Sequence, residues 1–342
     1  MTRLFPGWLL LGSALASGPD PSRCLTVFLG LASPDPVRLA RVLADAGIPM
    51  ARFDQAVIEV ADYLVGRGAV PAGNLFAHGN GIRVRSTLER KVGDENMPVV
   101  DASIREGINR RLEQSSPLTP AAVQGAAVVH ISVHQRPELF EREAALVPAD
   151  VPTLRLLGTE FSPLPGTLPR PFAARYSESG ELDVPLNATT VILSGGYCGE
   201  CQLRTIGDLA RGAAGDRKIV VLPDATYIAI QDGRNTIHRD LDFMSKKTSS
   251  VSLANLNFRE ELTGEPIRNA TQRALGIPET ERPAQVRQFM KNLLSQLKQE
   301  MKAAGFTLET SEFPADPGTL GGRFTFTRRA GGGRVAIEYG RP

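Results

Sequence analysis

Cysteine is scarce in this chain, with 3 residues in 342. So few cysteines exclude a small disulfide-stapled scaffold, in which several bridges replace a hydrophobic core. Hydrophobic residues instead make up 42% of the chain, enough for a sizeable core in one large domain plus a small one, or in two medium domains. Of the three cysteines, Cys198 and Cys201 lie three residues apart and form the candidate site of thiol chemistry, whereas Cys24 lies far from them in the chain.

A strong net charge is also lacking. The chain has 39 Lys and Arg against 37 Asp and Glu, which leaves +2 at neutral pH. Such a balance creates no overall field that would attract nucleic acid or an anionic membrane surface. The sequence therefore predicts no nucleic-acid partner and leaves a small-molecule ligand as the simpler expectation.

Long hydrophobic runs are absent except at the N-terminus, and that run is shorter than the ~18 residues that span a bilayer. There, Arg3 precedes an apolar stretch, and Ala14-Leu15-Ala16 has the small-x-small pattern of a cleavage site. We expect an export signal over residues 1–16 and a periplasmic or secreted protein that does not span the membrane. In an oxidising compartment Cys198 and Cys201 can form a disulfide.

Hydrophobic periodicity predicts strands and helices that alternate through most of the chain. The expected strands cover 24–31, 126–133, 153–157, 189–193 and 219–222, and the expected helices cover 36–46, 55–65 and 101–112, the last with Asp101 as its N-cap. Residues 137–185 are rich in proline and predict a long, largely irregular segment.

The last sixty residues have a different pattern. An apolar stripe predicts a helix over 283–304, and alternation predicts strands over 306–313, 323–328 and 334–339. We therefore predict a mostly parallel α/β sheet with helices on both faces over 24–275, and a small C-terminal α+β extension over 283–342.

Two histidines share one face of the strand predicted over 126–133, by its period of two. His130 and His134 could contact a metal together, but a structural metal needs three or four ligands, and no Cys or carboxylate falls at a supporting spacing. The sequence predicts no metal, no cofactor and no particular oligomeric state.

Residues 189–225 carry the most informative pattern. A β-branched run ends in Gly195-Gly196, a Cys-Gly-Glu-Cys turn follows, then an amphipathic run and a second apolar run that ends in Pro223-Asp224-Ala225. This order is typical of strand, turn, helix and strand. A helix N-terminus stabilises a thiolate, so the pattern places Cys198 and Cys201 where thiol chemistry is favoured.

One interpretation of the turn is redox exchange. Tyr197-Cys198-Gly199-Glu200-Cys201 resembles the Trp-Cys-Gly-Pro-Cys of the thioredoxin family, in which the first cysteine attacks and the second resolves the mixed disulfide. Export would suit a periplasmic thiol-disulfide oxidoreductase. No proline ahead of a following strand supplies the cis-proline of that family, because Pro223 comes after its strand.

A second interpretation comes from the spacing around Cys201. Gly195 lies six residues before it, Thr205 four after and Asp208 seven after, and Asp224-Ala225 follows the next strand. This pattern resembles the isochorismatase-like family of cysteine hydrolases. The resemblance implies that Cys201 is the nucleophile at a helix start, and it extends more weakly to residues 128–137 and 157–160.

The helpers that the family implies have no direct counterpart here. The family uses a Lys ahead of the cysteine strand, but no Lys occurs between Lys91 and Lys218, and Arg175 is the nearest cation. The family also uses an Asp from its first strand, for which Asp54 or Asp35 would be the substitute. Arginine stays protonated and cannot serve as a proton shuttle.

The sequence thus predicts an exported isochorismatase-like protein, either an active cysteine hydrolase with Cys201 as nucleophile or an inactive relative. The candidate site residues are Cys201, Cys198, Asp54 and Arg175. Two alternatives stay open: the oxidoreductase that uses Cys198 and Cys201, and a non-catalytic envelope binding protein whose cysteine pair forms a local disulfide.

Overall fold

The computed structural model describes residues 36–51, 53, 92–135, 139–158, 170–232, 235–240, 282–317, 319–329 and 331–341. The predicted export signal, Cys24, Asp35, Asp54 and the helix predicted over 55–65 lie outside the described residues. Contacts divide the chain into two compact units, residues 1–120 with 156–178 and residues 121–155 with 179–342.

The first unit contains helices α2 (Pro36–Asp45) and α5 (Met97–Ser115) and strand β3 (Phe172–Tyr176). Helix α5 begins four residues earlier than predicted. Asp101 is buried inside it rather than capping it, because Met97, Val99 and Val100 extend the apolar face toward the N-terminus. Strand β3 packs on this helix, and the backbone N–H of Tyr176 donates to Asn109 Oδ1 at 2.7 Å.

The second unit contains most of the sheet and its helices. Its elements are β1 (Val128–Val133), α7 (Phe140–Leu146), β4 (Thr190–Cys198), α8 (Cys201–Arg211), β5 (Arg217–Asp232), β6 (Asn235–Asp240), α11 (Arg282–Ala303), β7 (Phe306–Glu312), β8 (Gly322–Arg328) and β9 (Arg334–Tyr339). The division between the units passes through β2 (Thr153–Leu157) and beside the short helix α6 (Pro120–Gln124).

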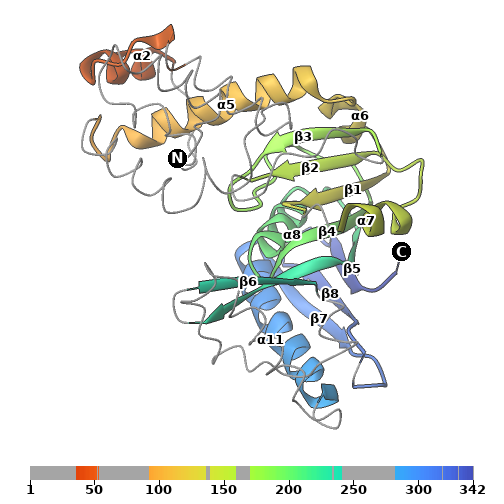
Figure 1. Ribbon diagram of the computed structural model, residues 1–342. Helices are drawn as coiled ribbons and strands as arrows, with labels where there is room; N and C mark the ends of the chain where they lie inside the picture. Colours follow the sequence, from red (N-terminus) through yellow and green to blue (C-terminus); the bar gives the residue numbers. More distant parts are fainter. Residues whose placement is uncertain are drawn as a thin grey trace, which may run out of the picture. The chain divides into compact units, whose positions relative to one another are not determined.

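The strands form one nine-stranded sheet in the order β3-β2-β1-β4-β5-β9-β8-β7, with β6 paired to β5 as a hairpin (Figure 1). The pairs β1/β4, β4/β5 and β5/β9 are parallel, whereas β9/β8 and β8/β7 are antiparallel. The predicted α/β class is thereby confirmed, with a parallel centre and an antiparallel end.

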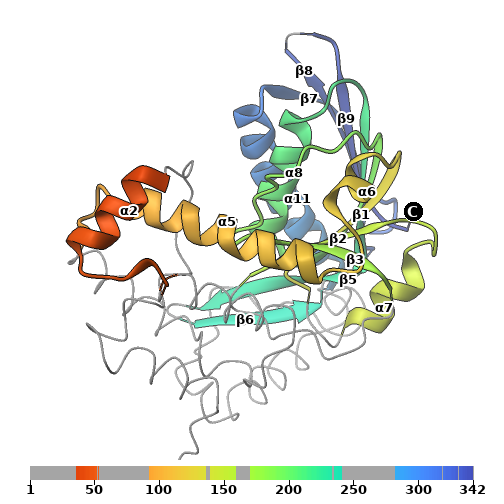
Figure 2. The same ribbon diagram turned by 90° about the horizontal axis from the view of Figure 1, so that it is seen from above.

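Helices cover both faces of the central strands in the second unit. Along β4, Val191 and Leu193 alternate with Ile192 and Ser194, and all four side chains are buried, so both faces need a cover. Helix α7 packs on the face of Ile192 through Val147, while α8 and α11 lie on the opposite side (Figure 2).

The C-terminal elements match the predicted helix and three strands closely. The prediction placed them in a small extension, but in the structure β9 pairs in parallel with β5, so the three strands continue the main sheet. Their apolar side chains, such as Phe324, Phe326 and Ile337, are buried on the α11 side. Residues 282–341 therefore complete the core of the second unit.

Strand β5 is much longer than the apolar run that predicted it. It passes through Pro223-Asp224 and continues into the hairpin with β6. The register against β4 shifts between Leu193/Val221 and Gly195/Thr226, which leaves extra residues on β5 as a bulge. Among the described residues, no helix is both long and apolar enough to cross a membrane.

Candidate functional site

The Cys-Gly-Glu-Cys turn lies at the carboxyl end of β4, beside the carboxyl end of β1. These two strands are parallel neighbours, and the helices that follow them, α7 and α8, pack on opposite faces of the sheet. Open α/β sheets bind their ligands at the carboxyl edge, at the point where neighbouring connections leave toward opposite faces. The topology thus puts the predicted site where the fold favours one.

Two glycines shape this turn. Gly195 has φ of +83°, and a Cβ there would clash with the carbonyl oxygen of Val133, so glycine lets β4 approach β1 closely at the strand end. Gly199 has φ of +92° and turns the chain after the strand. Glu200 then occupies the N-cap position, and helix α8 begins at Cys201.

Cys198 is the last residue of β4 and is only 7% exposed. Burial raises the pKa of its thiol from 9.0 to about 12. The phenol of Tyr339, at the end of β9, is electrostatically coupled to this thiol, and both burial and Cys198 raise its pKa. Cys198 is therefore a protonated thiol in the core at neutral pH, and its raised pKa counts against its predicted role as the attacking thiolate.

Cys201 is the first residue of α8 and is half-buried. Both Cys198 and Cys201 are free thiols, so the local disulfide that the sequence left open is absent from the structure. Cys198 ends β4 in the core, whereas Cys201 begins α8. Cys201 is the more accessible of the two sulfurs.

The residue after Cys201 fixes the helix start to the sheet. Gln202 is buried, and its Nε2 donates to the carbonyl oxygen of Gly195 at 2.8 Å and to Thr226 Oγ1 at 3.1 Å. These two acceptors come from β4 and β5, which are paired at this point. The first turn of α8 is therefore held in one position relative to the strand ends.

Thr205 and Asp208, which carry part of the family resemblance, bind the segment that precedes β4. Thr205 Oγ1 donates to the carbonyl oxygen of Gly180 at 2.6 Å, and Asp208 Oδ2 accepts from the backbone N–H of Leu182 at 2.8 Å. Gly180 has φ of +82° and contacts the carbonyl group of Cys201. In this structure both residues hold a loop against α8.

Asp224 was predicted to stand at a strand end, and this prediction is wrong because β5 continues past it. It lies in the β5 bulge, where its carboxylate is 3.8 Å from the guanidinium of Arg341. The bulge frees two carbonyl groups, and side chains near α7 bind them. Gln135 Nε2 donates to Ala225 O at 2.9 Å, and Arg142 Nη1 donates to Asp224 O at 3.3 Å.

Of the predicted helpers, Arg175 belongs to the first unit, and Asp54 and Asp35 lie outside the described residues. Arg175 lies on β3 in the first unit, where its guanidinium pairs with the carboxylate of Glu113 on α5. Cys201 belongs to the second unit. Asp54 and Asp35 lie outside the described residues, so the structure assigns them no position.

A buried polar network lies beneath α7, and sequence reasoning did not predict it. Glu143 of α7 is 2% exposed and accepts hydrogen bonds from Ser132 of β1 and Ser194 of β4, each at 2.7 Å. Gln135 Nε2 donates to the same oxygen, Oε2, at 2.7 Å, and the other oxygen, Oε1, pairs with Arg155 of β2 at 2.7 Å. One carboxylate thus links α7 to three strands.

The electrostatics of this network keep Glu143 ionised. Burial alone would raise its pKa, but the positive charges of Arg155 and His130 and the hydrogen bonds from Ser194 and Gln135 lower it from 4.5 to about 2. An ionised carboxylate in the core is stable only when it is paired and hydrogen-bonded in this way.

His130 joins the network through Ser194. Its Nε2 lies 2.9 Å from Ser194 Oγ, and its Nδ1 lies 3.1 Å from Thr153 Oγ1. Because the Ser194 hydroxyl donates to Glu143, its oxygen accepts from His130 Nε2. A histidine that donates to a serine cannot take that serine's proton, and the group is buried, so this is no Ser-His nucleophile pair.

The signal that could have revealed the network is the polar residues inside apolar strand runs. His130 and Ser132 interrupt one face of β1, and Ser194 interrupts the matching face of β4, two positions after Ile192. Buried polar groups require partners, so these interruptions indicate a polar cluster on the α7 side. The expectation that His134 shares a strand face with His130 is wrong, because β1 ends at Val133 and His134 has φ of +43°.

Within the described part of the chain, no cluster of three or more His, Cys, Asp or Glu residues could hold a metal ion. The best-formed candidate site is therefore the first turn of α8 around Cys201. No family model matches the chain, and neither the curated proteins nor the solved structures include a match.

Proposed function

We propose that this protein is an exported, isochorismatase-like cysteine hydrolase that acts on a small molecule, with Cys201 as its nucleophile. The observation that carries the proposal is the position of Cys201, a half-buried free thiol at the N-terminus of α8, at the carboxyl edge of a parallel sheet. The sequence resemblance around Gly195, Thr205 and Asp208 supports the same nucleophile.

The first turn of α8 supplies the electrostatics for this chemistry. The backbone N–H groups at a helix start have no partner within the helix, and the helix dipole favours negative charge there. Both effects stabilise the thiolate of Cys201 and the oxyanion that forms when it attacks a carbonyl carbon. Gln202 holds this turn against β4 and β5, so the amide groups are positioned before a ligand arrives.

The proposed reaction proceeds in two steps. The Cys201 sulfur forms a bond to the carbonyl carbon of the substrate, the bond from that carbon to the leaving group breaks, and the leaving group departs with a proton. Water then attacks the thioester, which releases the carboxylic acid and restores the thiol. The first step transfers the acyl group to sulfur and the second transfers it to water, so no oxidant or reductant is consumed.

Thiol reactivity tests the proposal without knowledge of the substrate. We expect iodoacetamide at neutral pH to alkylate Cys201 at least about tenfold faster than Cys198, because burial and a pKa of about 12 protect Cys198. Mass mapping of the labelled peptides distinguishes the two sites. Faster labelling of Cys198 would contradict the proposal and favour the oxidoreductase interpretation.

A model ester tests the hydrolytic step. With p-nitrophenyl acetate, we expect the release of p-nitrophenol together with an acetyl group on the Cys201 peptide. The Cys201→Ser variant should lose at least about 90% of this activity, and Cys198→Ser should retain most of it. Equal rates for the two variants, or acetylation at a different residue, would rule out Cys201 as the nucleophile.

A further inference from the structure

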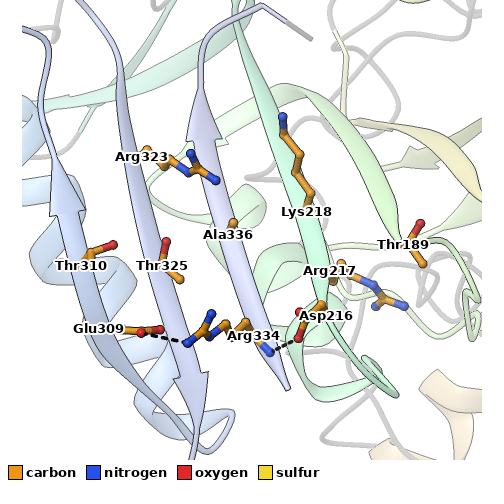
Figure 3. Close-up of a pocket in the computed structure, with 10 residues that line it drawn as sticks. All are labelled: Thr189, Asp216, Arg217, Lys218, Glu309, Thr310, Arg323, Thr325, Arg334 and Ala336. Carbon is orange, nitrogen blue, oxygen red and sulfur yellow. Dashed lines mark hydrogen bonds and ion pairs between the residues drawn. The ribbon is translucent and has the colours of Figure 1, made fainter. Parts of the chain in front are cut away.

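An open groove crosses the sheet on the face away from α8 and α11, with a volume of about 530 Å³ (Figure 3). Side chains along β9 alternate between the two faces of the sheet. Those of Val335, Ile337 and Tyr339 are buried on the α11 side. Those of Arg334, Ala336 and Glu338 therefore face the groove side. The groove is therefore separate from Cys201, and an inference about it does not depend on the hydrolase proposal.

Small side chains form the floor of the groove. Thr310, Thr325 and Ala336 are register partners on β7, β8 and β9, and Lys218 of β5 continues the same row. Figure 3 shows this row running straight across the strands. Three strand spacings give the groove a length of ~14 Å.

Ion-paired side chains form the two walls. On one side Glu338 accepts from Lys218 Nζ at 2.7 Å and lies 3.2 Å from Arg323 Nε. On the other side Arg334 Nη2 lies 3.2 Å from Glu309 Oε1. Arg334 and Glu338 are four residues apart on β9, so the walls are ~13 Å apart at their bases.

Several hydrogen-bonding groups of the groove remain available. Arg323 pairs with Glu338 through Nε, and Arg334 pairs with Glu309 through Nη2, so each guanidinium keeps further N–H donors. The two arginine side chains are 57% and 59% exposed. The hydroxyl groups of Thr310 and Thr325 make no hydrogen bond with any other described residue. The groove thus offers arginine donors at its walls and threonine hydroxyl groups on its floor.

The charges in the groove balance. Three cations are matched by three carboxylates. Lys218 and Arg323 share Glu338, Arg334 pairs with Glu309, and Asp216 in the groove lining carries the third negative charge. Arg217 adds no accessible charge, because its guanidinium donates to the carbonyl oxygens of buried backbone. A polyanion such as nucleic acid needs unneutralised cations, so this surface does not favour one.

The geometry points to a neutral, hydroxyl-rich ligand, and we propose that the groove binds an oligosaccharide. Neighbouring sugar hydroxyl groups can accept from an arginine N–H and donate to a carboxylate at the same time, and they can do both with the floor threonines. None of the described residues that line the groove has a large apolar side chain, so a hydrophobic peptide would gain little there.

Affinity electrophoresis of the full chain tests this proposal. Native gels would contain hydroxyethyl cellulose, laminarin, dextran or soluble starch as neutral probes, and a further gel would contain heparin as a polyanion. We expect retarded migration in at least one gel and no loss of retardation at high salt, because the groove has no net charge to screen. Thr325→Phe should fill the floor and weaken the apparent affinity at least about tenfold.

Thr307→Phe is the matched control, because Thr307 is an exposed threonine of β7 that does not line the groove. It should migrate as the unmodified protein does. Arg323→Met, at an exposed position, gives a second variant that should also weaken binding, and denaturation curves verify that each variant is folded.

Three results would overturn the proposal. The first is normal migration of the unmodified chain in every gel. The second is salt-sensitive retardation by heparin alone, which would identify a polyanion surface. The third is equal retardation of folded Thr325→Phe and Thr307→Phe, which would place the binding on a different surface.

Discussion

At the scale of the residue, Glu143 is the side chain on which the core depends most directly. It neutralises Arg155 and accepts hydrogen bonds from serines on β1 and β4. We expect Glu143→Gln to lower the free energy of unfolding by about 3 kcal/mol, because the substitution leaves a buried guanidinium without a counter-charge. Urea denaturation measures this change.

Glu141→Gln provides the matched control on the same helix, since Glu141 lies two residues before Glu143 and is exposed. It should change stability by less than about 0.5 kcal/mol. Similar losses for the two variants would mean that the network contributes no more than an ordinary surface charge.

The pKa of Glu143 also predicts how stability depends on acid. The pKa is lowered from 4.5 in the unfolded chain to about 2 in the folded protein, so the folded state binds this proton less readily. Its contribution, roughly 3 kcal/mol, is therefore present above pH 4.5 and is lost as the pH falls toward 2. His130 and Arg155 are the charged groups that face it.

Urea midpoints measured from about pH 5 down to about pH 2 test this dependence, in the unmodified protein and in Glu143→Gln. The gap between the two proteins should narrow as the pH falls, because both then carry an uncharged residue at position 143. A gap of constant size would show that Glu143 does not titrate in this range.

The sequence predicted the positions of the cysteines but not their environments. The Gly-rich turn and the amphipathic run after it were enough to place Cys201 at a helix start, because these signals are local. Cys198 lies beside Tyr339 of β9, and the next residue, Gly199, lies beside Gln296 of α11, and both partners come much later in the chain. No short stretch of sequence around Cys198 can therefore predict that this thiol is buried.

At the scale of the element, the junction of β1 and β4 depends on Gly195. Its φ of +83° and the close Val133 carbonyl both exclude a side chain. We expect Gly195→Ala to cost at least about 3 kcal/mol and to disturb the start of α8, because Gln202 binds the Gly195 carbonyl oxygen. Denaturation and the Cys201 alkylation rate both report the change.

Gly215→Ala is the comparison for this substitution, because a Cβ at Gly215 meets no atom within 4 Å. It should leave both stability and alkylation close to the unmodified values. If Gly195→Ala behaved the same way, the close approach of β1 and β4 would not require glycine.

Elements with a strong local pattern were predicted almost to the residue. Strands β2 and β9 and helix α11 match the expected ranges within one residue at either end, because alternation or an apolar stripe defines them fully. Strand β3 and helix α7 were missed inside the Pro-rich segment 137–185, where loop signals outweighed short apolar runs. The extent of β5 was missed because Pro223 indicated a strand end, whereas the chain forms a bulge there.

At the scale of the whole molecule, the C-terminal strands belong to the main sheet. We expect a chain that ends before α11 to lose cooperative unfolding, because it lacks β9 beside β5 and the apolar cover of α11. Its Cys198 should then be alkylated about as fast as Cys201. Urea denaturation and thiol mapping test both expectations.

A truncated chain that kept one sharp transition and a protected Cys198 would contradict this view. It would show that residues 282–341 form a separate module, as the small extension expected from the sequence implied. Unfolding of the truncated and the full chain therefore shows whether residues 282–341 share one hydrophobic core with the main sheet or form a second one.

The parallel pairing of β5 with β9 has a consequence for folding. Lys218 and Ala336 are register partners although a long stretch of chain separates them, so loop closure must occur before their contacts gain stability. Contacts of this kind slow folding, because the chain between the two partners must be ordered before their pairing stabilises the sheet. We therefore expect β5 to form its local hairpin with β6 early in folding and to gain its partner β9 late.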